Sequence, residues 1–534
     1  MKNMKQGPFM KIHNAFAALF MGLAACAHNP AVSVPTEVTS AQPDFKAEAE
    51  RAMAAFDSTG MVVSVRVDGE TIYLDAFGTA EEGSGRAVTK DTLFPIASIS
   101  KAFTTTALAI LADRGELNWD DPIRKYIPEF AMHDPWVSEH FTIRDALTHR
   151  SGLPLGAGDL LFWPDGRPTI DDILAAVPHL EPTAGFRSEY AYDNLLYVIA
   201  GEVVVRASGK SWPDFVTQEI LEPVGLDNCA ADSTRLKPEQ DVVTGHERAA
   251  GATEGTPIDK RTQFAPSIAA AAGIYCPAGD MMTWAQFWLD GAVTQDGKRL
   301  VSEKNLEELW TGVTPKSTRG VVKASGLTHN TLYALGWNVQ DFDGVRMISH
   351  SGGAPGVVSN FILLPEKNIA IFASSNDYRA APHAFAYQVA DGLISDQDFD
   401  FIGTWGTGFA ASIEAAKASL SDAAKRPASA QNPSLPLSAY VGTYRDPWYG
   451  DVTLSLKNGA LFIDMSRSEI LNGPLSDYDG DTFVVNWPDK SLKADAFVNF
   501  TVKDGRVTGM TMNAVSDITD FSFDFHDLNL AKVE

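Results

Sequence analysis

Alternating apolar and polar positions predict a β-hairpin near the start of the folded chain. Residues 61–67 and 72–77 each have the short alternating pattern of a strand, and Asp68-Gly69 lies between them as a turn. Residues 94–115 follow, with large apolar side chains among small ones and with Arg114-Gly115 at the end. We therefore expect two antiparallel strands and then a mostly buried helix.

Later segments continue this mixture of strands and helices. Apolar positions predict a core helix over residues 195–205. Two strands are expected at residues 358–364 and 369–374, joined by a turn. Residues 266–288 are expected to form a strand of small residues and then a helix that starts at Asp280.

The composition changes after residue 398. Residues 399–435 are rich in Ala, Ser, Lys and Pro, which is typical of a linker, with helix expected only over residues 412–425. Residues 436–534 hold short alternating strands separated by Asn-Gly and Asp-Gly turns, which predict an antiparallel barrel or sandwich of about 100 residues. Because 534 residues are too many for one core, we expect a first domain at residues 45–398 and a separate β-barrel domain after the linker.

The first 44 residues have the pattern of an export signal and a tether. Lysines precede an apolar run at residues 15–25, which is too short to span a bilayer and suits a signal peptide. The run ends in Leu-Ala-Ala-Cys, which resembles the bacterial lipobox and predicts lipidation of Cys26; a cleaved signal with an incidental cysteine is the alternative. Residues 1–26 are thus expected to be a signal peptide and residues 27–44 a tether. Since Ala27 follows the cysteine, we expect an outer-membrane lipoprotein of the cell envelope (periplasm) that contacts the membrane only through its lipid anchor.

The charge of the chain excludes some partners. Lys and Arg total 43 against 68 Asp and Glu, which gives a formal net charge of −25 at pH 7. This charge repels nucleic acids and anionic lipid surfaces, so we expect no nucleic-acid partner. No spacing of Cys and His resembles a zinc site, and we expect no metal and no other cofactor. Cys229 and Cys276 can pair after export, but we interpret them as buried small apolar residues.

The first candidate for catalytic chemistry is Ser98-Ile99-Ser100-Lys101 in the predicted helix. Side chains three positions apart lie on one helix face, with Cβ atoms about 5–6 Å apart. A neutral Lys101 amine can take the proton of the Ser98 hydroxyl and make it a nucleophile. Burial and the positive end of the helix dipole favour the neutral amine, and the same helix end stabilises the oxyanion of acyl transfer. A capping serine followed by a solvated lysine is the alternative.

Two more stretches place polar groups beside core elements. Tyr192-Asp193-Asn194 precedes the predicted helix 195–205, where a phenol and an amide can face a cleft or merely pack and cap. His350-Ser351-Gly352-Gly353 lies on or just before a strand, and glycines there would let a substrate backbone approach closely. His149 lies at a helix end, and we expect it to bond the last helix carbonyls rather than to act as a base.

The three motifs Ser98-x-x-Lys101, Tyr192-x-Asn194 and His350-x-Gly352, in this order, resemble the signature of the serine β-lactamase and penicillin-binding protein superfamily. The second motif resembles the class C branch, which includes class C β-lactamases, D-alanyl-D-alanine carboxypeptidases, D-aminopeptidases and carboxylesterases. The resemblance covers residues 45–395 and implies an α+β fold. One part is an antiparallel sheet flanked by helices and built from both ends of the segment, the other part is mainly helical, and the active site lies between them.

The resemblance also implies a role for each motif residue. Ser98 attacks a carbonyl and forms an acyl-enzyme, while Lys101 and Tyr192 move protons. The oxyanion hole consists of the Ser98 N–H and the N–H just after the third motif. The amide of the second motif holds the substrate amide or the lysine. The positions assigned to substrate binding are Asn194, His350, Gly352 and Gly353.

The chain departs from the resemblance at His350. Class C β-lactamases and most penicillin-binding proteins carry lysine there, and its charge holds a substrate carboxylate. A mostly neutral imidazole binds carboxylates less strongly near pH 7, which weakens the β-lactamase interpretation. His-x-Gly instead resembles D-aminopeptidases and related peptidases and esterases. We therefore expect a serine peptidase or amidase for small peptides, with D-amino-acid-containing or non-ribosomal peptides favoured. A carboxylesterase is the first alternative, a β-lactamase ranks below it, and an envelope-binding lipoprotein is the non-enzymatic alternative.

Overall fold

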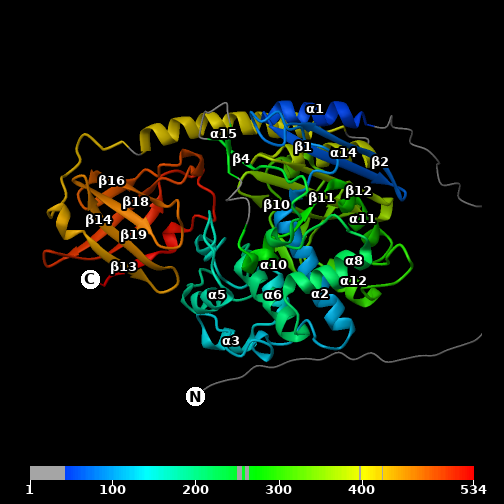
Figure 1. The fold of residues 1–534 in the computed structure, drawn as a ribbon, viewed down its shortest axis with the longest axis horizontal. Helices are drawn as coiled ribbons and strands as arrows, with labels where there is room; N and C mark the ends of the chain where they lie inside the picture. Colours follow the sequence, from blue (N-terminus) through cyan, green and yellow to red (C-terminus); the bar gives the residue numbers. More distant parts are fainter. Residues whose placement is uncertain (1–42, 249–254, 259–263, 396–397, 424, 534) are drawn as a thin grey trace, which may run out of the picture. The chain divides into compact units, whose positions relative to one another are not determined.

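An eight-stranded antiparallel sheet organises the first domain (Figure 1). The computed structural model describes residues 43–248, 255–258, 264–395, 398–423 and 425–533, so the predicted signal peptide and Cys26 lie outside the described residues. The strand order β2-β1-β12-β11-β10-β9-β8-β7 places the N-terminal hairpin beside strands from the far end of the domain. The strands are β1 (Gly60–Val67), β2 (Glu70–Gly78), β7 (Thr314–Lys316), β8 (Thr331–Tyr333), β9 (Asn338–Phe342), β10 (Val345–Ala354), β11 (Val357–Leu364) and β12 (Ile369–Ser375).

Helices cover both faces of this sheet (Figure 1). Helices α1 (Phe45–Phe56) and α14 (Ala381–Ile394) share one core with Met61, Val63 and Val65 of β1. Val62 faces a second core on the opposite side of the sheet, as the two-residue period of a strand requires. The predicted hairpin and the sheet built from both ends of the segment are therefore confirmed.

The second core is mainly helical and surrounds α2 (Ser100–Asp113), which is buried from Ser100 to Leu111. Helices α6 and α10 both contact α2. The other helices of the domain are α3 (Pro135–His140), α4 (Ile143–Leu147), α5 (Ile170–Ala176), α6 (Leu195–Ser208), α7 (Trp212–Val216), α8 (Glu222–Val224), α10 (Ala269–Ala272), α11 (Ala278–Leu289), α12 (Glu303–Trp310) and α13 (Gly320–Ser325). Two small sheets pair β3 (Phe94–Pro95) with β6 (Tyr275–Cys276) and β4 (His246–Glu247) with β5 (Thr256–Pro257).

The structure corrects the expected strand of small residues within residues 266–288. Its run of four alanines forms the short helix α10, because alanine favours helix over strand, and only Tyr275 and Cys276 are extended as β6. The following helix α11 begins at Ala278, two residues earlier than expected. This change brings the carbonyl of Ala271 close to α2, where it becomes part of the site described below.

The expected linker, residues 399–435, contains a longer helix than the composition indicated. Helix α15 spans Phe401–Ala423, and its first residues Phe401 and Ile402 are fully buried in the core shared with α1 and α14. The Phe401 ring packs 5.5 Å from the ring of Tyr387 on α14. The apolar start of α15 therefore belongs to the first domain, and the Pro- and Ser-rich remainder leads to the second.

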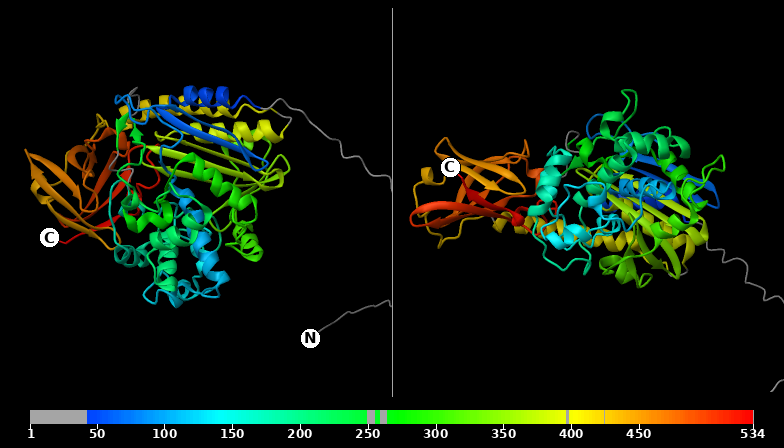
Figure 2. Two further views of the ribbon diagram at one scale, coloured as in Figure 1. Left: turned by 45° about the vertical axis from the view of Figure 1, so that its right-hand side comes forward. Right: turned by 90° about the horizontal axis from the view of Figure 1, so that it is seen from below.

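The C-terminal domain is a closed antiparallel barrel, as predicted, and Figure 2 shows it from two sides. Its strands are β13 (Gly442–Asp446), β14 (Gly450–Lys457), β15 (Ala460–Met465), β16 (Asn472–Asp479), β17 (Thr482–Val485), β18 (Ala496–Lys503), β19 (Arg506–Ala514) and β20 (Asn529–Lys532). Closure leaves no free sheet edge. In the described part of the chain, every helix is too short or too polar to cross a bilayer.

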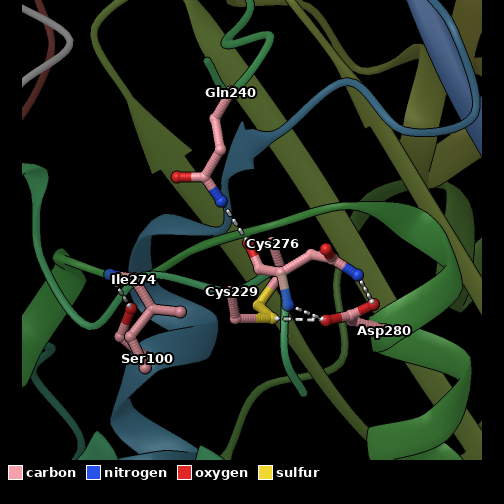
Figure 3. The surroundings of a disulfide bond; sticks show 7 residues. Ser100, Cys229, Gln240, Ile274, Cys276 and Asp280 are labelled. Atoms are coloured by element: carbon pink, nitrogen blue, oxygen red, sulfur yellow. Dashed lines mark hydrogen bonds between the residues drawn. A yellow bond between two sulfur atoms is a disulfide. The ribbon is translucent and has the colours of Figure 1, made fainter. Parts of the chain in front are cut away.

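Cys229 and Cys276 form a disulfide bond, shown in Figure 3, which corrects the interpretation that favoured unpaired cysteines. The physical reason is a β-bridge between Ala230 and Tyr275, which places the neighbouring cysteines with their Cα atoms 4.3 Å apart. The disulfide bond lies beside α2, where the Ile274 N–H donates to the Ser100 hydroxyl at 3.0 Å. The disulfide thus links β6 to the segment around Cys229, next to the start of α2.

Candidate active site

Ser98 lies in a short helical turn, Ala97–Ile99, between β3 and α2. Lys101 lies in the first turn of α2, and its Nζ is 3.1 Å from Ser98 Oγ. The chain reaches this turn through Ala97, whose φ of 46° is unusual for a residue with a side chain. The hydroxyl and the amine of the first motif therefore meet at the start of a buried helix.

Three oxygen atoms surround the Lys101 amine. Nζ lies 2.8 Å from Asn194 Oδ1 and 3.1 Å from the Ala271 carbonyl oxygen, in addition to Ser98 Oγ. The side chain is fully buried, and this burial lowers the pKa of Lys101 to about 7 against the opposing effect of two nearby aspartates. A neutral amine has two N–H groups, which the amide oxygen and the carbonyl accept. Its lone pair then faces the hydroxyl of Ser98.

Tyr192 closes the site on the side of the second motif. Lys101 Nζ lies 4.8 Å from the centre of the Tyr192 ring. Burial holds the pKa of Tyr192 well above 10, and the nearby Ser98 hydroxyl offsets only part of this shift. The phenol is therefore neutral near pH 7, so that it can relay a proton but does not act as a phenolate base.

His149 holds the segment that carries Tyr192. Its Nδ1 accepts the Asp193 N–H at 3.1 Å, and its ring centre lies 4.2 Å from that of Tyr192 and 4.5 Å from that of Tyr333. Burial lowers the pKa of His149 well below 6.5, so the ring is neutral. The prediction that His149 bonds the last carbonyls of the preceding helix is wrong, because the ring faces the second motif. His149 positions Tyr192 by packing and by one hydrogen bond.

His350 of the third motif has both ring nitrogens engaged. Nε2 accepts the Tyr333 hydroxyl at 2.9 Å, and Nδ1 donates to the Ser351 carbonyl at 2.6 Å. Burial, strengthened by the positive charge of Lys101, lowers the pKa of His350 to about 3. The imidazole is therefore neutral near pH 7 and does not supply the positive charge that a lysine would supply at this position.

The structure gives the glycines of the third motif a packing role. A Cβ atom on Gly352 would lie 2.1 Å from the Ile96 carbonyl oxygen, so only glycine lets β10 pass beside the turn that holds Ser98. A Cβ atom on Gly353 would lie 3.2 Å from the ring of Tyr378. The prediction that the glycines leave room for a substrate backbone is therefore corrected at Gly352, because the Ile96 backbone occupies the space beside it.

Ser98 lies on the wall of a cavity of about 370 Å³, which is near the lower end of the range for small-molecule sites. Tyr192, Asn194 and His350 line the same cavity, so the structure brings the three motifs together. The C-terminal domain also contributes to the wall, through Asp520, Phe521 and Ser522. This contribution could not be predicted from the sequence, since these residues follow β19 and belong to no motif.

Two buried aspartates, Asp159 and Asp524, connect the two domains at the site, and burial raises the pKa of each well above 3.8. Asp159 Oδ2 accepts Asn194 Nδ2 and the Ser522 hydroxyl, each at 2.9 Å. Asp524 accepts the N–H groups of Gly158 at 2.7 Å and of Leu160 at 3.0 Å. Asp159 thus orients the amide that contacts Lys101. Neither aspartate was predicted from the sequence, because neither belongs to a motif and Asp524 lies among other acids.

Comparison with protein families gives two matches. The model of the beta-lactamase family matches residues 45–392. A model described as a domain of unknown function, DUF3471, matches residues 426–532, which contain the barrel. The first match contains all three motifs, and the second contains Asp520, Phe521 and Ser522, which line the cavity from the C-terminal domain.

Individual proteins and structures are similar as well. An unguisins hydrolase of Aspergillus campestris is 26% identical over 442 residues, which cover 77% of each chain. Penicillin-binding protein 4 of Amycolatopsis lactamdurans is 28% identical over 59% of this chain and 80% of its own. An octameric penicillin-binding protein homologue from Pyrococcus abyssi superposes with a TM-score of 0.59 at 19% identity, over 91% of this chain and 99% of its own. A D-amino acid amidase from Ochrobactrum anthropi has a TM-score of 0.55 at 23% identity, over 66% of this chain and 99% of its own. At these identities the two structures show the shared fold.

Proposed function

Because this chain belongs to the beta-lactamase family of serine hydrolases, we propose that it hydrolyses amide bonds of small peptides through an acyl-enzyme at Ser98. One observation carries the proposal. The Ser98 hydroxyl lies 3.1 Å from a fully buried Lys101 amine, and the two other hydrogen-bond partners of this amine are the Asn194 and Ala271 oxygen atoms, both acceptors. This arrangement directs the lone pair of the neutral amine at the hydroxyl, as a general base requires.

In the acylation step, the Lys101 amine takes the Ser98 proton while Oγ bonds to the substrate carbonyl carbon. The carbonyl oxygen becomes an oxyanion, and the N–H groups of Ser98 and Gly353 stabilise it. The C–N bond of the tetrahedral intermediate then breaks. The departing amine takes a proton from Lys101 by way of the Tyr192 phenol, and the acyl group stays on Ser98 as an ester.

In the deacylation step, water replaces the departed amine. The Lys101 amine and the Tyr192 phenol take a proton from the water as its oxygen attacks the ester carbon. The second tetrahedral intermediate releases the carboxylic acid, and Ser98 Oγ recovers its proton. The site thus returns to its starting state without any co-reactant other than water.

Peptides that contain D-amino acids or non-ribosomal linkages are the favoured substrates. Two similarities support this choice: one relative is named an unguisins hydrolase, and the fold is shared with a D-amino acid amidase. The neutral His350 does not itself hold a β-lactam carboxylate in the way that the lysine of the usual third motif does. A carboxylesterase is the alternative, since the same chemistry acts on esters.

Covalent labelling tests the nucleophile directly. A fluorophosphonate probe should add one label to the purified protein, located at Ser98 by peptide mass spectrometry, and Ser98→Ala should abolish the label. Labelling that persists in Ser98→Ala would contradict the proposal. Turnover of D- and L-peptide amides, a short-chain nitrophenyl ester and nitrocefin then ranks peptidase, esterase and β-lactamase activities. A protein that takes no label and cleaves none of these would support the non-enzymatic alternative.

We also propose that the protein is exported and anchored to the cell envelope through a lipid on Cys26. The support is the sequence pattern of residues 1–26 alone. Metabolic labelling with a fatty-acid analogue should label the full chain, and Cys26→Ser should lose both the label and the membrane fraction. Unlabelled wild-type protein released into the periplasm would contradict lipidation while leaving export intact.

A further inference from the structure

Lys316 places a cationic side chain in the wall of the active-site cavity. It is the last residue of β7, and its side chain lines the same cavity as Ser98. Its Nζ donates to Asn338 Oδ1 at 2.5 Å and lies 4.7 Å from the centre of the Tyr190 ring and 5.6 Å from that of Tyr333. These contacts hold the amine in place, and all of them are with neutral groups.

Lys316 has no counter-charge among the described residues. Throughout the residues that the structure describes, no Asp or Glu side chain forms an ion pair with it. Burial lowers the pKa of Lys316 to about 8 with no opposing effect from a carboxylate. A partly buried cation of this kind is unfavourable in the empty protein, and a bound anion would stabilise it.

Strand pairing places this cation at one end of the third motif. Lys316 contacts Asn338 of β9, and Asn338 pairs with Ser349 of β10, the residue before His350. His350 itself is neutral. A cation from β7 therefore stands beside the position where other members of the superfamily carry their lysine.

The other end of the motif carries the opposite charge. Gly353 lies four residues after Ser349, or about 13 Å along an extended strand. Next to Gly353 is Tyr378, whose hydroxyl donates to the Asp520 carboxylate at 3.0 Å. Asp520 lines the cavity too. The cavity is thus positive near Ser349 and negative near Gly353, so an anionic group on the substrate is directed toward Lys316.

We propose that Lys316 binds the free α-carboxylate of a short peptide substrate and so determines the specificity of the enzyme for peptide acids. The inference rests on the proposed function of Ser98. An α-carboxylate belongs to the C-terminal part of a peptide, which is the amine side of the bond that is cut. The leaving group therefore extends toward Lys316, and the acyl group extends toward Gly353 and Asp520.

Matched peptide acids and amides test this role. The probes are the four stereoisomers of N-acetyl-phenylalanyl-alanine, each with a free carboxylate and as its C-terminal amide. Lys316→Met should lower kcat/KM for the preferred acid by about 30-fold or more, through KM, because it removes the partner of a buried charge. The matched amide should change less than about threefold, and Lys316→Arg should recover most of the activity on the acid. Lys323→Met, which removes an exposed lysine on α13, is the control and should leave both rates unchanged.

Protection of Ser98 from a neutral fluorophosphonate provides a readout that needs no turnover. The peptide acids should slow the labelling of the wild type at lower concentrations than the amides, and Lys316→Met should abolish this difference. Equal losses on acid and amide, or no loss on either, would overturn the role of Lys316. Wild-type protein that cleaves none of the peptides but shows acid-selective protection would instead overturn the proposed peptidase function and retain the carboxylate site.

Discussion

Burial sets the protonation state of each titratable side chain around Ser98. It lowers the pKa of Lys101 to about 7 and that of His350 to about 3, and it raises the pKa of Tyr192. Near neutral pH the imidazole and the phenol therefore keep one state, whereas the amine changes its charge. Asp193, whose pKa burial raises to about 7, is a second group that titrates in this range.

Tyr192→Phe tests the proton relay at the level of one atom. It should lower kcat by about 100-fold or more, as is typical for loss of a general acid-base group, because the departing amine then lacks its proton donor. The ring remains and can keep its packing against His149, so the thermal unfolding midpoint should change little. Steady-state kinetics and a melting curve check the two expectations. Tyr387→Phe removes a buried phenol in the other core and is the control. Near-normal turnover in Tyr192→Phe would remove the phenol from the mechanism.

The motif residues could be found from the sequence because their spacing is local. Ser98 and Lys101 lie one turn apart, and Tyr192 and Asn194 lie two residues apart, so each pair is visible without a fold. Asp159 and Lys316 could not be found in this way. Each is a single residue with common chemistry, and its place in the cavity depends on contacts to Asn194 and Asn338 that only the folded chain provides.

At the scale of elements, the crossing of β10 with the Ser98 turn joins the first and third motifs. The two segments approach so closely at Gly352 that a Cβ atom would meet the Ile96 carbonyl oxygen. Backbone atoms move only with their whole element, so this contact has little room to adapt. The turn that presents Ser98 and the strand that carries the proposed oxyanion N–H therefore meet at one steric contact.

Gly352→Ala should separate these two elements. We expect a loss of stability of about 1–3 kcal/mol, as for other overpacked sites, and a loss of fluorophosphonate labelling that exceeds the loss of folded protein. Chemical denaturation and labelling kinetics measure the two effects. Gly279→Ala is the matched control, because its Cβ would meet no atom within 4 Å in helix α11, and it should be neutral or slightly stabilising. Unchanged labelling in Gly352→Ala would show that the contact does not position the site.

Elements were predicted correctly where a long apolar run or a turn signal marked them and incorrectly where the composition was ambiguous. The N-terminal hairpin has an Asp-Gly turn between its strands, and α6 is a nearly continuous apolar run. The alanine run formed a helix because alanine favours helix over strand, and this helix packs against α2. Pairing of Cys229 with Cys276 depends on a bridge between segments 47 residues apart, which no local pattern shows.

At the scale of the whole molecule, the C-terminal barrel completes the cavity. The segment after β19 places Phe521 in the cavity wall and donates a hydrogen bond from Ser522 to Asp159. Asp524 holds the backbone on either side of Asp159. The barrel fold was predictable from its turns, but this contact was not, because it joins positions more than 360 residues apart.

Asp524→Ala tests the coupling of the two domains. It leaves the N–H groups of Gly158 and Leu160 without their acceptors, so stability should fall by about 1–3 kcal/mol for each buried group left unpaired. Turnover should fall too, since Asp159 then loses its support and orients Asn194 less well. Calorimetry and peptide kinetics measure both, with Asp517→Ala, an exposed acid of the same segment, as the control. Full activity in Asp524→Ala would mean that the barrel contact is dispensable for catalysis.

If the neutral amine of Lys101 activates Ser98, the rate of Ser98 labelling by a fluorophosphonate must depend on pH. The rate should be low when Lys101 is protonated and should rise with pH through a midpoint near 7, the pKa to which burial lowers it. Asp193→Asn separates the two groups that titrate there. Because the Asp193 charge raises the pKa of Lys101, the variant should keep the rise and shift its midpoint to lower pH. A rate that does not depend on pH between 5 and 9, or a rise that disappears in Asp193→Asn, would show that Lys101 is not the base that activates Ser98.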